Sequence, residues 1–139
     1  MDSIKQVQQK IKSAGQLVKH FQSISLADLT KISIETALKI IASETRKSGA
    51  RKTAEWAAFW IDFAGIDTNA VTETVMSKNI AYGNAIEEPA MIFCNDSPEQ
   101  RLLSRLDDKA SRLLKGEAAG EDTMLDIAGY LLILIALRL

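Results

Sequence analysis

The sequence predicts an all-α protein, a helical bundle of about six helices, and three observations support this. Its 139 residues include only two prolines and seven glycines, whereas a β-sandwich or barrel needs many turns. Aromatic residues reach just 6%, which also disfavours a sheet-rich fold. Apolar residues recur at spacings of three and four, the period of an amphipathic helix. At this length we expect one compact domain.

The first predicted helix covers residues 4–21, where apolar residues form a heptad-like stripe. The stripe consists of Ile4, Val7, Ile11, Ala14, Val18 and Phe21. It fits packing on the chain's own core, or alternatively an arm that pairs with another subunit. Because a chain this small has limited core to cover such a stripe, we expect it to lie partly between subunits.

Capping residues and glycines divide the next segment into two helices. Ser25, with Asp28 three residues later, is similar to a capping box, so a second helix is expected from there to Gly49. A third helix is predicted over residues 50–64, because Gly65 follows it as a stop.

Three more helices are predicted in the second half of the chain. The fourth covers residues 68–81, and residues 82–96 lose the helical period and form a long loop. The stretch Ser97-Pro98-Glu99 combines a cap, a proline in the first turn and an acid, which predicts a fifth helix to about residue 115. The sixth begins near Glu121 and runs to the end.

Composition excludes several classes of function. With one cysteine and one histidine, the chain has no disulfide framework of its own and no cysteine-based zinc site. A net charge of −1 disfavours general nucleic-acid binding. The start of the chain lacks the apolar run of a signal peptide, and the apolar run at the end is about half the roughly 20 residues of a membrane span. We therefore expect a cytoplasmic protein with no membrane association.

Charge is uneven along the chain, since residues 1–66 carry a net +4 and residues 67–139 a net −5. This asymmetry suits a bound cation together with an anionic ligand. It equally suits two segments that pack on each other.

The predicted fifth helix carries the most informative cluster of charges. At 100° per residue, Arg105, Asp108, Lys109 and Arg112 share one face. Three cations on a stripe suit phosphate binding, with Asp108 orienting a cation or binding a metal ion. The alternative is a solvated face held by ion pairs between successive turns.

The predicted sixth helix begins with two carboxylates, Asp122 and Asp126, on one face. Like charges at this spacing repel, and a cation between them would remove that cost. The helix dipole alone accounts for Asp122, but Asp126 enters an apolar segment and needs a partner such as Arg105, Lys109 or Mg²⁺. Gly129, one turn later, would let a helix or a ligand approach closely.

Two further groups are candidates for ligand contacts. Lys78, Asn79 and Tyr82 lie at the end of the predicted fourth helix, where a base could stack or form hydrogen bonds; the alternative is an ordinary helix terminus. A basic cluster around Gly49 could hold phosphates, or could simply be a solvated connection between helices. That cluster consists of Arg46, Lys47, Arg51 and Lys52.

The motifs of residues 70–139, in this order, resemble a known family. They are Lys78-Asn79-x-x-Tyr82-Gly83, Arg105-x-x-Asp108-Lys109-x-x-Arg112-Leu113 and Glu121-Asp122-Thr123-x-x-Asp126-x-x-x-Tyr130. Together they resemble the phage-associated "nucleotide modification associated domain" family. That family is distantly similar to the all-α nucleotide pyrophosphohydrolases of the MazG and dimeric dUTPase type.

The resemblance implies a nucleotide-binding helical core at residues 67–139, with residues 1–66 as an added helical region, an arm or oligomerisation helices. It also implies a Mg²⁺ site, for which Glu73, Asp108, Asp122 and Asp126 are the candidate ligands. The pyrophosphohydrolases place acids three residues apart on two helices. This chain has Met76 where an acid would pair with Glu73, and its two later acids are four residues apart.

Three functions follow as hypotheses. In the first, a phage protein acting in the cytoplasm of its host binds a nucleotide, or another phosphorylated nucleoside, and sequesters it, for example as a host-defence signal. In the second, the chain is a Mg²⁺-dependent nucleotide pyrophosphohydrolase. In the third, it is a helical interaction module. We expect a homo-oligomer, which is compatible with all three.

Overall fold

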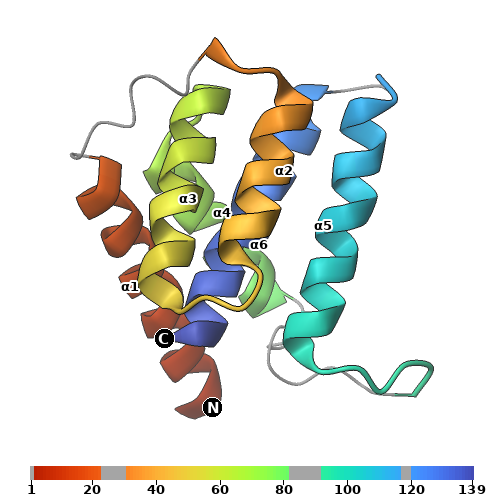
Figure 1. The fold of residues 1–139 in the computed structure, drawn as a ribbon. Helices are drawn as coiled ribbons and strands as arrows, with labels where there is room; N and C mark the ends of the chain where they lie inside the picture. Colours follow the sequence, from red (N-terminus) through yellow and green to blue (C-terminus); the bar gives the residue numbers. More distant parts are fainter. Residues whose placement is uncertain (1, 23–30, 82–91, 117–119) are drawn as a thin grey trace.

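The computed structural model describes residues 2–22, 31–81, 92–116 and 120–139, and within these it contains six α-helices and no strand (Figure 1). The predicted all-α fold is therefore confirmed. The helices are α1 (Asp2–Gln22), α2 (Ile34–Thr45), α3 (Ala50–Ala64), α4 (Thr68–Ala81), α5 (Pro98–Leu114) and α6 (Gly120–Arg138).

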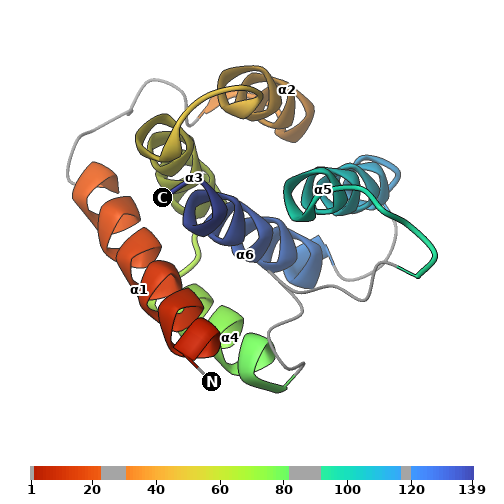
Figure 2. The same cartoon turned by 90° about the horizontal axis from the view of Figure 1, so that it is seen from below.

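Helix α6 lies at the centre of the bundle. Viewed along the helices, α1, α3, α4 and α5 surround it, and each of the four contacts it (Figure 2). Helix α2 packs on α3 and also touches α5. An apolar helix at the end of the chain thus finds partners on most of its circumference, which explains why it needs no polar face along most of its length.

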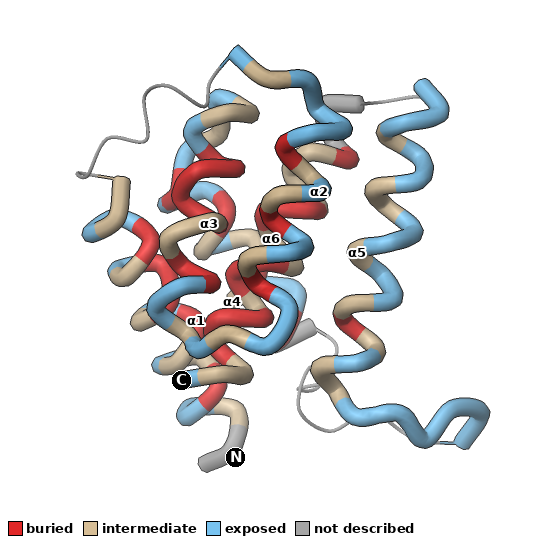
Figure 3. The backbone as a smooth tube through the Cα atoms, in the orientation of Figure 1, coloured by how far each residue is buried: buried red, intermediate tan, exposed pale blue. Residues whose placement is uncertain are grey.

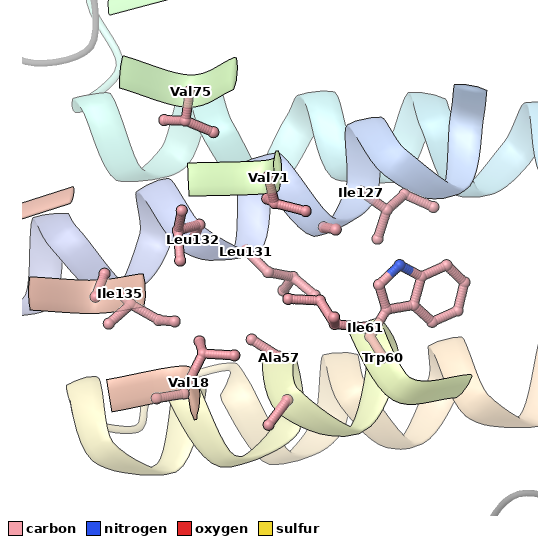
Figure 4. Packing of buried hydrophobic residues seen from close by; sticks show 14 of the residues in the cluster. Val18, Ala57, Trp60, Ile61, Val71, Val75, Ile127, Leu131, Leu132 and Ile135 are labelled. Carbon is pink, nitrogen blue, oxygen red and sulfur yellow. The ribbon is translucent and has the colours of Figure 1, made fainter. Parts of the chain in front are cut away.

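The core is one contiguous cluster of buried residues (Figure 3), and in it side chains of α6 meet those of α1, α3 and α4 (Figure 4). Trp60 of α3 is fully buried, and its indole N–H donates a hydrogen bond to the backbone oxygen of Met124 at 3.1 Å. The other large apolar side chains that are fully buried are Ile11, Val18, Ile61, Val71, Ile127, Leu131, Leu132, Leu134 and Ile135. Residues before and after position 66 therefore share a single core.

The apolar stripe of α1 is covered by the chain's own helices. Val7, Ile11, Ala14 and Val18 are buried against that core, while Ile4 and Phe21 are half-buried. The chain's own core thus accounts for these four residues, and the expectation that part of the stripe lies between subunits stays a prediction. The bundle supplies enough surface because α1 packs on α3, α4 and α6 together.

Helix α2 begins later than the sequence predicts. Its N-cap is Ser33, whose Oγ accepts a hydrogen bond from the backbone N–H of Thr36 at 3.1 Å. The expected start at Ser25 and Asp28 lies outside the described residues, but residues 31–33 are not α-helical, so no continuous helix joins the two. The helix ends at Thr45, and Gly49 is the N-cap of α3 instead of the stop for α2.

The remaining helices have bounds close to those predicted, because local signals mark them. Gly65 ends α3 in the left-handed conformation, with φ of 70°. Ser97 caps α5 by accepting a hydrogen bond from the backbone N–H of Gln100 at 3.1 Å, and Pro98 follows in the first turn. Across the described parts of the chain, no helix has both the length and the apolar character to cross a membrane.

Candidate functional site

A pocket of about 630 Å³ lies over α6 between α4 and α5. Helix α4 forms one wall, α5 forms the opposite wall, and α6 forms the floor. Its lining residues are Val71, Thr74, Val75, Lys78, Asn79, Pro98, Arg101, Leu102, Arg105, Leu125, Asp126, Gly129, Tyr130, Ile133 and Leu137. The pocket therefore collects residues from three of the stretches that the sequence singled out.

The pocket combines an apolar interior with cationic walls. Aliphatic side chains such as Val75, Leu102 and Ile133 supply the apolar surface. Lys78 on one wall and Arg101 and Arg105 on the other supply positive charge. Such a mixture, mostly apolar with a few polar groups that converge, is typical of small-molecule sites.

Asp126 is the carboxylate among the described lining residues, and an ion pair holds it in place. Its Oδ2 lies 2.9 Å from the Nζ of Lys109, with the two side chains 31% and 21% exposed. This pair joins α5 to α6 and neutralises the carboxylate's charge. The charge that remains at the pocket is therefore positive.

Arg101 is a pocket residue that the sequence argument missed. Its Nε donates a hydrogen bond to the backbone oxygen of Asp96 at 3.3 Å, and its guanidinium also donates to the backbone oxygen of Cys94. These bonds fix the side chain at the start of α5. The available signal was its spacing, since Arg101 stands one turn before Arg105 on the same face.

The cationic face predicted on α5 is split by the structure. Arg105 lines the pocket and Lys109 pairs with Asp126, but Arg112 is exposed and lies outside the lining. The cause is the antiparallel packing of α5 on α6. The pocket extends from Arg105 towards the start of α5, whereas Arg112 lies in the last turn.

The candidates on α4 fall at the opposite wall. Lys78 is exposed at the pocket, and Asn79 is buried and also lines it. Tyr82, the third candidate of this group, lies outside the described residues. Tyr130 of α6, which the sequence argument placed only in the family motif, contributes an aromatic ring to the pocket.

The carboxylates proposed as metal ligands are not brought together in the described residues. Glu73 and Asp108 are exposed and lie outside the pocket lining, and Asp126 is engaged by Lys109. The side chain of Asp122 lies outside the described part of the structure. Among the residues that the structure does describe, no group of three or more His, Cys, Asp or Glu could hold a metal ion. Binding of Mg²⁺ therefore stays a prediction.

The basic cluster around Gly49 is partly engaged by neighbouring helices. Lys52 lies 2.9 Å from Glu44, whose hydrogen bond and charge raise the pKa of that lysine. The guanidinium of Arg51 lies over the ring of Phe21, 5.7 Å from its centroid. These contacts agree with the interpretation of the cluster as a solvated helix connection.

Two ion pairs fix α5, the wall that carries Arg101 and Arg105, to α6. Lys109 and Asp126 form the first, and Glu99 and Arg138 form the second, at 2.7 Å near the other end of the helix. Arg138 also donates to the Oγ1 of Thr53 at 2.9 Å and to the backbone oxygen of Thr45. The position of α5 is thus set by charged contacts at both ends, with Leu102 as its buried residue.

No protein-family model, curated protein or solved structure matches this chain.

Proposed function

We propose that the protein binds a phosphorylated nucleoside, or a similar small anion with an apolar ring, in the pocket between α4, α5 and α6. The single observation that carries the proposal is the convergence of Lys78, Arg101 and Arg105 on an otherwise apolar cavity. A volume of about 630 Å³ falls within the 300–1,000 Å³ range of small-molecule sites.

The charges of the pocket favour an anionic ligand. Arg105 is exposed at the pocket and makes no ion pair with any side chain that the structure describes, so its guanidinium can form two parallel hydrogen bonds with a phosphate. Lys78, on the opposite wall, adds a second point charge. Because Lys109 already neutralises Asp126, the pocket does not repel the ligand's negative charge.

The apolar floor favours a ligand that also has a flat or apolar part. Leu125, Ile133 and Leu137 of α6 face the same cavity as the cations. A purely inorganic anion would leave this surface in contact with water, whereas a nucleoside would cover it. A phosphorylated nucleoside satisfies both halves of the pocket.

The proposal is for binding without conversion, which suits a protein that sequesters its ligand. The pocket's described carboxylate is engaged in an ion pair, so it supports ligand positioning better than activation of water. Pyrophosphohydrolase activity with Mg²⁺ is the alternative outcome that the same experiment detects.

Calorimetric titration with nucleoside mono-, di- and triphosphates, each with and without Mg²⁺, tests the proposal. Product formation is followed in the same samples by chromatography. We expect saturable binding of at least one nucleotide, no requirement for Mg²⁺, and no product. Absence of binding across the panel would refute the proposed function. Product that appears only with Mg²⁺ would replace it with the hydrolase.

A further inference from the structure

Two glycines lie in the interior of helices that the structure describes, Gly15 in α1 and Gly129 in α6. Glycine inside a helix is destabilising relative to alanine, because the unfolded chain loses more conformational freedom. Each position therefore needs a structural or functional reason to lack a side chain. The structure gives a different reason for each.

Gly15 is required by the packing of α1 on α4. A Cβ atom at this position would lie 2.5 Å from the Oγ1 of Thr72 and 3.2 Å from its Cγ2. The hydroxyl of Thr72 donates a hydrogen bond to the backbone oxygen of Thr68 at 2.9 Å, and this bond restricts the movement of the side chain. Close contact between two helices thus explains this glycine.

Packing does not explain Gly129. A Cβ atom there would meet Val75 Cγ2 at 3.4 Å, an ordinary van der Waals contact, and no other atom of the described residues within 4 Å. The backbone of α6 at Gly129 lines the pocket. The missing side chain therefore leaves space on the ligand side of the helix, at the cost of some helix stability.

The neighbours of Gly129 define what can fill that space. Leu125 lies one turn before it and Ile133 one turn after it, and both line the pocket. Between them the backbone of α6 presents an apolar surface, since its peptide groups are hydrogen-bonded within the helix. Asp126, held by Lys109, places a carboxylate at the edge of this surface, where it can accept a hydrogen bond from a ring N–H or amino group.

We propose that Gly129 is a specificity position, at which the nucleobase of the ligand lies directly against the α6 backbone. The inference rests on the proposed function, because it assumes that Arg105 holds the phosphate of the same ligand. The ligand class is thereby narrowed from phosphorylated nucleosides and similar ring-bearing anions to those whose planar ring carries a hydrogen-bond donor.

Two glycine-to-alanine variants give opposite signatures. Gly129→Ala should raise the melting temperature, because alanine favours the helix and Val75 leaves room for it. It should also lower the affinity for AMP and GMP by about tenfold or more, because the added methyl group occupies space that the ring needs. Gly15→Ala should lower the melting temperature and leave the affinity for both nucleotides unchanged when measured well below the transition.

Titration with ribose 5-phosphate, which lacks the base, distinguishes the contribution of the ring to binding from that of the phosphate. We expect Gly129→Ala to bind it as the parent does. Equal weakening of ribose 5-phosphate and AMP, or a lowered melting temperature for Gly129→Ala, would overturn the inference. If the parent binds AMP or GMP and Gly129→Ala binds them equally well, the inference fails while the proposed function stands. If the parent binds no nucleotide, the proposed function fails, and the inference fails with it.

Discussion

Arg105 and Arg112 lie on the same helix, yet only Arg105 lines the pocket. Replacing Arg105 with Ala should weaken nucleotide binding by about 10- to 100-fold, because a hydrogen bond to a charged group contributes about 1.5–3 kcal/mol. Arg112→Ala is the matched control, since it removes the same charge two turns away and should leave the affinity unchanged. Calorimetric titration at two salt concentrations measures both variants.

Salt dependence and the Arg105→Lys variant test the same role of Arg105 in two further ways. The parent's affinity should fall as salt rises, because Arg105 is exposed and its charge is screened. Arg105→Lys keeps the charge but loses the planar fork, so it should bind more weakly than the parent. Equal losses from Arg105→Ala and Arg112→Ala would show that net charge, and not the pocket, drives binding.

The effects of Asp126→Ala and Asp107→Ala on stability provide a second comparison between single residues. Asp126→Ala removes the half-buried ion pair with Lys109 and should lower the free energy of unfolding by about 1 kcal/mol, the upper end for such pairs. Asp107 is exposed on α5, about 160° around that helix from Lys109, so Asp107→Ala should change the free energy of unfolding by less than about 0.5 kcal/mol. Urea unfolding of both variants measures the difference. Similar values would mean that the ion pair contributes nothing.

At the scale of the elements, the start of α2 is set by a single cap. Ser33→Ala should lower the free energy of unfolding by about 1 kcal/mol, because the backbone N–H of Thr36 loses its acceptor. Ser43→Ala, at an exposed position within the same helix, should be neutral or slightly stabilising. Thermal unfolding compares the two, and an equal loss for both would argue against the cap.

Helix bounds could be predicted where a short-range signal is unambiguous. Gly65 and the Ser97-Pro98 pair act within one turn, so the sequence alone locates the end of α3 and the start of α5. The start of α2 is harder to predict, because Ser25 and Ser33 are both of a residue type that caps helices and periodicity does not rank them. Local chemistry identifies which residues can cap a helix, whereas tertiary packing selects the one that does.

The pocket could be predicted only in part, for a related reason. A helical wheel places Arg105, Lys109 and Arg112 on one face, but it does not tell which length of that face a neighbouring helix covers. The packing of α6 leaves Arg105 in the pocket, engages Lys109 and leaves Arg112 outside. Arg101 was missed because its role depends on the same packing.

At the scale of the whole molecule, α5 is the most weakly anchored wall of the pocket. Leu102 is its buried residue, and the helix is exposed or half-buried over the rest of its length (Figure 3). Helices α3 and α6, by contrast, supply most of the large buried side chains. An element with few buried apolar contacts opens at a lower free energy than the core, so α5 should open before α3 and α6 do.

Hydrogen exchange should therefore report ligand binding at α5. Without ligand, the amides of residues 98–114 should exchange faster than those of α3 and α6. A nucleotide that bridges Arg105 and the α6 floor must leave before α5 can open, so at 100 times its Kd it should slow that exchange by up to about 100-fold. Exchange in α2, which contributes no residue to the pocket lining, should change little. In Arg105→Ala the same nucleotide concentration should slow the exchange of these amides less, because the affinity is lower. A slowing spread evenly over all helices would contradict a site between α4 and α5.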